Sequence, residues 1–220
     1  MERKIILSVR NLNVKFRLRG KVLHAIRDIS LDVYKGESLA IVGESGSGKS
    51  VFTKTFMGLL DKNGYIESGE ILYKGKNLAA FQTEKEWLTI RGREIAMVLQ
   101  DPMTSLNPLK TIGAQIGEAI RLHQGLKGCT LKEAVIDILK DVGISEPEKR
   151  YKQYPHEFSG GMRQRVVIAI AIACRPKLLI CDEPTTALDV TIQAQILELL
   201  KSLKEKYELT TIYITHDLGV

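Results

Sequence analysis

Residues 38–50 read Ser-Leu-Ala-Ile-Val-Gly-Glu-Ser-Gly-Ser-Gly-Lys-Ser, a short apolar run that leads directly into a glycine-rich loop. Residues 43–50 match the pattern G-x-x-x-x-G-K-[ST] of a phosphate-binding loop. Residues 38–42 predict a short buried strand, and residues 49–60 have helical character. A strand before the loop and a helix after it are what such a motif requires, so the stretch predicts an α/β nucleotide-binding fold rather than a flexible linker.

The chemistry of this loop depends on its backbone and on one lysine. Backbone N–H groups surround the β-phosphate, and glycines permit the turn and the close approach. We expect Lys49 to neutralise β- and γ-phosphate oxygens and the Ser50 hydroxyl to bind Mg²⁺. Val51 lacks the second hydroxyl that many phosphate loops carry, although its N–H remains available. The predicted nucleotide ligands here are Gly43, Glu44, Ser45, Gly46, Ser47, Gly48, Lys49, Ser50 and Val51.

A second chemical signal is the acidic pair Asp182 and Glu183, which follows the apolar residues 178–181. The apolar run predicts a buried strand, where a carboxylate is costly unless it serves a cation. We therefore expect Asp182 to be a Mg²⁺ ligand and Glu183 to polarise an attacking water. The alternative is a pair of solvated loop acids, which the preceding apolar run disfavours.

Strand-like and helix-like patterns alternate along the rest of the chain. Strands are predicted at residues 5–16, 25–33, 64–74, 94–99, 177–181 and 210–215, and helices at 111–143, 159–174 and 191–207, with Ser159 as an N-cap. Alternation around a phosphate loop predicts an α/β domain with a mainly parallel core. With 220 residues, the chain suits one large domain, 1–220.

Composition and charge disfavour several classes of protein. The longest apolar run, residues 166–174, is too short to cross a bilayer, and no secretory signal follows the N-terminal charges. The net charge of +6 is spread over dispersed Lys and Arg residues, which favours a solvated surface over nucleic-acid binding. Cys129, Cys174 and Cys181 form no C-x-x-C pair, so neither a disulfide nor a metal site is expected. We expect a cytosolic protein, unless a partner ties it to a membrane.

Residues 158–165, Phe-Ser-Gly-Gly-Met-Arg-Gln-Arg, narrow the interpretation to one superfamily. Placed between the phosphate loop and the acidic strand end, they resemble the signature of ATP-binding-cassette (ABC) ATPases. The resemblance covers essentially the whole chain. It implies a P-loop NTPase domain with a RecA-like, mainly parallel core, an antiparallel β subdomain and an α-helical subdomain at about 101–173, inserted before the acidic strand.

This resemblance gives roles to residues that the patterns alone leave open. Gln100 resembles the Q-loop glutamine, which lies near Mg²⁺ and senses the membrane partner, and residues 187–189 resemble the D-loop. His216 resembles the switch histidine that contacts the γ-phosphate. Phe16 occupies the position of the aromatic residue that stacks on adenine, but it could equally belong to the core.

The signature residues would act on a different nucleotide from the phosphate loop of their own chain. In the resembled family, Ser159, Gly160 and Gly161 cap the γ-phosphate that the opposite subunit binds. Two positions depart from the family pattern. Phe158 replaces the usual Leu, and Met162 replaces the usual Gln, so a polar contact from position 162 to the partner's nucleotide is in doubt.

Finer features resemble the importers of dipeptides and oligopeptides, namely residues 100–108, 158–165 and 182–190. The resemblance implies an ATPase that uses ATP and Mg²⁺ to couple hydrolysis to peptide uptake. Its partners would be transmembrane permease subunits and a second ABC ATPase subunit, identical or paralogous, in a head-to-tail dimer. An extracytoplasmic solute-binding protein would act indirectly, and no nucleic acid is expected. The chain would lie at the cytoplasmic face of the cell membrane.

Other interpretations stay open at this point. A nickel importer would use the same ATPase, and a soluble ABC ATPase that acts on DNA or ribosomes is a further alternative. Only about 110 residues separate loop from signature, with no sustained heptads, which disfavours the DNA-acting class. Intact Gln100, Glu183 and His216 disfavour an inactive regulatory subunit. The chain ends shortly after His216, whereas the resembled proteins continue, so we expect the C-terminal part of the cassette, and any iron–sulfur site there, to be missing.

Overall fold

The computed structural model describes residues 4–186 and 188–216. The chain divides into two compact units. We call Met1–Arg91 with Thr210–Val220 the β-rich unit, and Gly92–Leu209 the helical unit.

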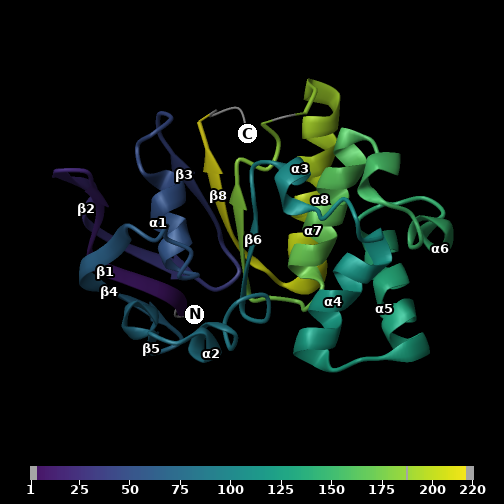
Figure 1. The fold of residues 1–220 in the computed structure, drawn as a ribbon, viewed down its shortest axis with the longest axis horizontal. Helices are drawn as coiled ribbons and strands as arrows, with labels where there is room; N and C mark the ends of the chain where they lie inside the picture. Colours follow the sequence, from purple (N-terminus) through teal and green to yellow (C-terminus); the bar gives the residue numbers. More distant parts are fainter. Residues whose placement is uncertain (1–3, 187, 217–220) are drawn as a thin grey trace. The chain divides into compact units, whose positions relative to one another are not determined.

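An antiparallel sheet forms much of the β-rich unit (Figure 1). Its strands, in the order β2-β1-β4-β5, are β2 (Lys21–Tyr34), β1 (Ile5–Leu18), β4 (Gly64–Tyr73) and β5 (Lys76–Asn77). Alternating apolar side chains of β1, among them Leu7, Val9 and Val14, are fully buried. The predicted strands at 5–16, 25–33 and 64–74 are therefore confirmed, because period-two patterning sets one face of each strand against a core.

Two parallel strands carry the glycine-rich loop and the last described residues of this unit. Strand β3 (Ser38–Val42) pairs with β8 (Thr210–Thr215), and Val42 lies opposite Thr215. Both strands have the predicted bounds. The predicted burial of 38–42 is wrong, since its residues are exposed or half-buried in alternation. The reason is position: within the described residues, β3 pairs with β8 alone and forms an edge of its sheet.

Helix α1 (Lys49–Thr55) is shorter than the predicted helix at 49–60. The chain leaves the helix at Gly58, which has a φ of 59° in the left-handed region. Beyond it, the N–H of Leu59 donates to the carbonyl of Lys54 at 3.0 Å, the hydrogen bond of a Schellman ending. A glycine three residues after the end of α1 therefore stops a pattern whose apolar spacing continues. The short elements η1 (Leu78–Ala80) and α2 (Glu84–Trp87) complete this unit.

The helical unit contains two parallel strands and a group of packed helices (Figure 1). Its elements are β6 (Ile95–Val98), α3 (Pro102–Ser105), α4 (Ile112–Gln124), α5 (Gly128–Asp141), α6 (Pro147–Arg150), η2 (Pro155–Glu157), α7 (Gly160–Ile172), β7 (Leu178–Asp182) and α8 (Val190–Tyr207). The region 111–143 was predicted as helical, and it forms two helices because Gly125, in the left-handed region, ends α4.

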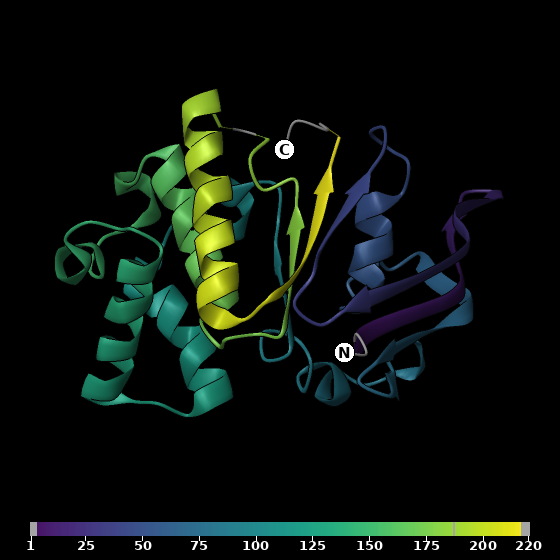
Figure 2. The same ribbon diagram turned by 180° about the vertical axis from the view of Figure 1, so that it is seen from behind.

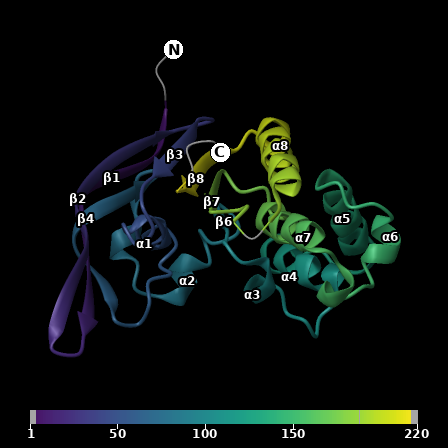
Figure 3. The same cartoon turned by 90° about the horizontal axis from the view of Figure 1, so that it is seen from above.

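Helix α7 is the centre of this unit and contacts α3, α4, α5, α8 and β6. Figure 3 shows α7 between α4 and α8, and Figure 2 shows α8 beside α7. Residues 166–172 of α7 are all apolar, and residues 166–169 are buried, as expected for a helix covered by neighbours. The Ser159 hydroxyl caps it by accepting from the N–H of Met162 at 3.4 Å, which confirms the predicted N-cap.

Together, the antiparallel sheet, the parallel strand pairs and the helical group are the parts of the predicted fold class. No helix in the described ranges is both long enough and apolar enough to span a membrane.

Candidate functional site

The glycine-rich loop, residues 43–48, connects β3 to α1 within the β-rich unit. Gly48 precedes α1 with a φ of 94°, a backbone conformation that residues with a Cβ rarely adopt. A Cβ at this position would also lie 3.0 Å from the backbone oxygen of Ala25. Both the turn and the close approach to β2 therefore require glycine, which is why the motif has this spacing.

Lys49 holds its charge inside the loop. The side chain is almost fully buried, and its Nζ donates to the carbonyl oxygens of Gly43 at 2.7 Å and Glu44 at 2.8 Å. These two hydrogen bonds offset the cost of taking an ammonium out of water. Ser47, Gly48 and Lys49 also line an open groove of about 430 Å³ whose other walls are largely apolar side chains of β2 and β3. The positive charge of Lys49 thus lies beside an accessible groove.

His216 follows β8 in the same unit and is exposed. Because Val42 pairs with Thr215, Gly43 and His216 both leave the sheet at the carboxyl ends of neighbouring parallel strands. This edge is where open α/β sheets bind ligands. Ser50 and Val51, in the first turn of α1, are half-buried.

Phe16 lies on β1 and is only 9% exposed. Its ring packs on the backbone of Gly64 in β4, where a Cβ would come within 2.6 Å of the ring. An aromatic residue that stacks on a base needs an accessible ring face. Of the two interpretations that the sequence left open, the burial of Phe16 supports the core residue.

Gln100, Asp182 and Glu183 lie together in the helical unit. Val98 of β6 pairs with Cys181 of β7, so the chain segments that carry these three side chains leave adjacent parallel strands at the same edge. Gln100 Nε2 donates to Glu183 Oε2 at 3.1 Å. Asp182, only 6% exposed, ends a strand that is buried throughout. The two predicted acids therefore differ in setting: Asp182 is buried at the end of the strand, and Glu183 is half-buried just after it.

The backbone at Glu183 is unusual. Its φ of 46° lies in the left-handed region, which for a residue with a Cβ costs of order 1–3 kcal/mol. Such conformations persist where surrounding contacts stabilise them. Two contacts do so here, and neither was predicted from the sequence. Thr186 Oγ1 donates to Glu183 Oε2 at 2.9 Å, and the buried Gln164 donates from Nε2 to the carbonyl of Pro184 at 2.7 Å. The only available signal for Thr186 was its place three residues after Glu183, a spacing that turns bring together.

The signature residues stand at the start of α7. Ser159 and Gly160 are exposed, and Gly161 is half-buried. Phe158, which replaces a leucine of the resembled pattern, is 3% exposed, so an apolar core side chain has replaced another. Met162 is half-buried and its N–H is used by the cap.

Residues 187–189, predicted as a D-loop, are described in part. Ala187 lies outside the described residues. Asp189 caps α8, since its Oδ1 accepts from the N–H of Ile192 at 3.0 Å.

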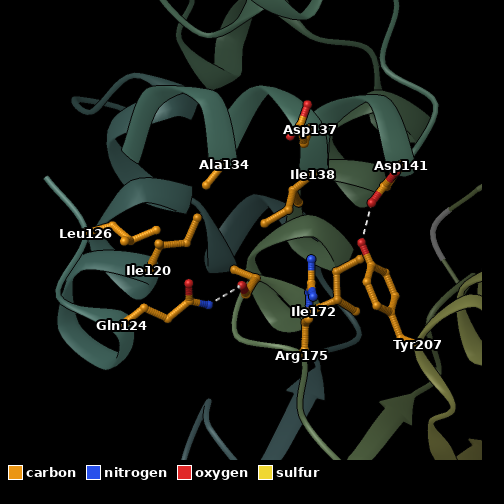
Figure 4. A pocket seen from close by; sticks show the side chains of 11 residues that line it. Ile120, Gln124, Leu126, Ala134, Asp137, Ile138, Asp141, Ile172, Arg175 and Tyr207 are labelled. Atoms are coloured by element: carbon orange, nitrogen blue, oxygen red, sulfur yellow. Dashed lines mark hydrogen bonds between the residues drawn. The ribbon is translucent and has the colours of Figure 1, made fainter. Parts of the chain in front are cut away.

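A second pocket, of about 460 Å³, opens among α4, α5, α7 and α8 (Figure 4). Apolar side chains such as Ile120 and Ile138 meet Asp141, Arg175 and Tyr207 there, and the Tyr207 hydroxyl donates to Asp141. Burial, and then this hydrogen bond, raises the pKa of Tyr207 to about 12. No predicted site residue lines this pocket.

The cysteines differ in environment. Cys129 is exposed, Cys174 is half-buried and Cys181 is buried. Burial raises the pKa of Cys174 to about 11 and raises that of Cys181 as well. In the part of the chain that the structure describes, no group of three or more His, Cys, Asp and Glu residues is arranged to hold a metal ion.

Similarity to known proteins agrees with this geometry. Residues 26–186 match the family model described as "ABC transporter". The oligopeptide transport ATP-binding protein AmiE of Streptococcus pneumoniae is 59% identical over 219 residues, which are 100% of this chain and 62% of AmiE. The oligopeptide transport ATP-binding protein OppD of Bacillus subtilis is 55% identical, over 98% of this chain and 60% of OppD. The dipeptide transport ATP-binding protein DppD of the same organism is 53% identical, over 98% of this chain and 64% of DppD.

Solved structures with the same fold include ATP-binding cassettes. The dimeric cassette MJ0796, bound to ADP and phosphate after hydrolysis, is 27% identical with a TM-score of 0.84, over 97% of this chain and 89% of that chain. The protein cbiO1 of Clostridium perfringens, part of an ABC transporter complex, is 29% identical with a TM-score of 0.80, over 97% of this chain and 79% of the cbiO1 chain.

These comparisons confirm the predicted fold class and the predicted family. The chain spans about three fifths of the length of the curated relatives. A family model that covers residues 26–186, together with relatives that align along essentially the whole chain, shows that this chain belongs to the ABC transporter family.

Proposed function

We propose that this chain binds and hydrolyses ATP as the energy-coupling subunit of an ABC importer for dipeptides or oligopeptides. The observation that carries the proposal is the buried Lys49 ammonium, which lies inside the glycine-rich loop and bonds two of the loop's own carbonyls. A lysine ammonium beside an accessible groove fits a ligand with phosphate groups, to which it can donate charge-assisted hydrogen bonds. The peptide substrate is supported by the names of AmiE, OppD and DppD, which are peptide-transport proteins.

In this proposal the loop binds the phosphates of ATP. Backbone N–H groups of residues 43–48 face the β-phosphate, Lys49 pairs with β- and γ-phosphate oxygens, and His216 contacts the γ-phosphate. Support comes from the register of β3 and β8, which places Gly43 and His216 at the same strand edge.

Mg²⁺ fits the oxygen donors that the chain offers. Mg²⁺ at nucleotide sites takes one or two protein oxygens together with phosphates and water, so a large acidic cluster is not needed. We assign the Ser50 hydroxyl, Asp182 and Gln100 as its ligands, and the near-complete burial of the Asp182 carboxylate fits this role. When bound, Mg²⁺ would neutralise charge on the β- and γ-phosphates.

Glu183 is the proposed general base. It would take a proton from a water whose oxygen attacks the γ-phosphorus, while the bond between that phosphorus and the β–γ bridging oxygen breaks. ADP and inorganic phosphate are the products. The position of Glu183, at the end of a buried strand with its carboxylate held by Gln100 and Thr186, supports a positioned base rather than a freely moving surface acid.

The signature residues would act on a partner's nucleotide. We assign Ser159, Gly160 and Gly161 to cap the γ-phosphate bound by a second cassette, identical or paralogous, in a head-to-tail dimer. Their place at the exposed start of the 13-residue helix α7 supports this role, because a helix N-terminus attracts anions. A dimeric cassette is among the solved structures with this fold.

The remaining partners follow from the importer assignment. Transmembrane permease subunits would hold the chain at the cytoplasmic face of the cell membrane, and an extracytoplasmic solute-binding protein would deliver peptide to them. Residues 100–108 and the helices α4 and α5 are the surface that we assign to the permease. Cysteine cross-linking in the assembled transporter should therefore map permease contacts to these segments.

The substitution Glu183→Gln tests the ATPase proposal. It preserves size but removes the base, which typically contributes 10²–10⁴-fold to a rate. We expect the variant to bind ATP, to hydrolyse it at least about 100-fold more slowly, and to accumulate as an ATP-dependent dimer in light scattering. Ser159→Arg added to it should abolish the dimer and leave ATP binding intact. Normal hydrolysis by Glu183→Gln would mean that another residue is the base.

A further inference from the structure

Two side chains donate to the same oxygen of Glu183. Thr186 Oγ1 lies 2.9 Å from Glu183 Oε2, and Gln100 Nε2 lies 3.1 Å from it. A glutamate side chain has three rotatable bonds, so a carboxylate at a strand terminus would otherwise sample many orientations. With both donors on Oε2, rotation of the carboxylate would break two hydrogen bonds at once. These two donors therefore restrict the orientation of the proposed base.

Thr186 is itself held in place by helix α8. Gln193, in the first turns of α8, donates from Nε2 to the carbonyls of Thr185 and Leu188, each at 3.1 Å. The N–H of Leu188 also donates to the carbonyl of Thr185 at 3.1 Å, and the N–H of Thr186 donates to that of Glu183 at 3.4 Å. The turn that carries the Thr186 hydroxyl is thus hydrogen-bonded to an 18-residue helix. A hydroxyl on such a support can define a position for its acceptor.

We propose that Thr186 is a positioning residue for Glu183: its hydroxyl, held by the turn that Gln193 anchors to α8, aligns the carboxylate for removal of the water proton. The inference rests on the proposed ATPase function. It also explains how the left-handed backbone of Glu183 is tolerated, since the side-chain and backbone bonds from Thr186 close the turn around it.

A matched pair of variants separates the hydroxyl from the rest of the Thr186 side chain. Thr186→Val keeps the shape and removes the donor, whereas Thr186→Ser keeps the donor and removes the methyl group. Thr186 is exposed, so neither change creates a core cavity. A small displacement of a catalytic group can cost up to about 100-fold in rate. We therefore expect Thr186→Val to lower kcat for ATP about 10- to 100-fold with the KM for ATP unchanged, and Thr186→Ser to stay within about threefold of wild type.

A double-mutant cycle with Glu183→Gln shows whether the effect passes through Glu183. If Thr186 acts by aligning the base, Thr186→Val should cause no further loss once the base is gone. The proposal is overturned by a wild-type kcat in Thr186→Val, by equal losses in the Val and Ser variants, or by an undiminished loss in the Glu183→Gln background. Wild-type chain that hydrolyses ATP no faster than Lys49→Ala would instead refute the ATPase function itself, and this inference with it.

Discussion

Tyr207 and Asp141 show how one partly buried contact links protonation to stability. The hydroxyl of Tyr207, at the end of α8, donates to Asp141 at the end of α5 (Figure 4). Lys206 Nζ lies 2.5 Å from the same carboxylate. Burial is the larger cause of the raised pKa of Tyr207, and the hydrogen bond to Asp141 is the second. The folded chain therefore binds the phenolic proton more tightly than an unfolded chain, in which the ordinary pKa is about 10.

The sign of the pH dependence follows directly. Because the folded pKa of Tyr207 is about 12 and the unfolded pKa is about 10, the stabilisation is complete below pH 10 and is lost as the pH rises toward 12. Tyr207→Phe should lower the free energy of unfolding by about 1 kcal/mol at pH 8. The difference between wild type and variant should shrink between pH 10 and 12. Urea unfolding at several pH values measures it, and a difference that stays constant up to pH 12 would contradict this linkage.

Individual residues also differ in how far their roles in the candidate site could be predicted from the sequence. Lys49, Asp182 and Glu183 could be proposed from the sequence, because each follows a strand-like run in a spacing tied to phosphate or metal chemistry. Thr186 was not, because its contact depends on the left-handed backbone of Glu183, which no pattern indicates. For Phe16, patterning allowed two environments, and only the packing on Gly64 distinguishes them.

At the scale of elements, strand and helix identities followed from periodicity, but boundaries and burial did not. β3 and β8 have the predicted bounds, yet β3 is exposed in alternation because its burial depends on neighbouring strands. Helix α1 stops early at Gly58, where the backbone turns left-handed against the ring of Trp87. The spacing of apolar residues does not reveal a glycine that ends a helix, because the same spacing continues past the glycine.

Gly58 gives a prediction for this element boundary. A Cβ there would lie 2.3 Å from the Trp87 ring and would adopt a left-handed φ, so both overpacking and backbone strain would result. Gly58→Ala should lower the free energy of unfolding by about 2–4 kcal/mol. Gly125 is a matched control, since it has a φ of 71° but open space around it. Gly125→Ala should cost only about 1 kcal/mol. Equal losses in urea unfolding would show that steric contact with Trp87 contributes nothing.

At the scale of the whole molecule, the chain carries two sets of residues to which we assign functional roles, one in each unit. The β-rich unit has the glycine-rich loop and His216, and the helical unit has Gln100, Asp182, Glu183 and the signature. The family and the fold class could be predicted from the order of these motifs along the chain. The register of the parallel strands then explains why Gly43 and His216 in one unit, and Gln100, Asp182 and Glu183 in the other, follow the carboxyl ends of their strands.

Calorimetric titration with Mg-ATP shows whether the glycine-rich loop binds ATP through Lys49. Wild type and Glu183→Gln should bind with similar affinity, because Glu183 is assigned to hydrolysis. Lys49→Ala removes charge-assisted bonds to phosphate worth about 1.5–3 kcal/mol each, so its affinity should fall at least about tenfold. Thermal unfolding of the variant without nucleotide controls for loss of the fold. Unchanged affinity in a folded Lys49→Ala protein would mean that the loop does not bind ATP through Lys49.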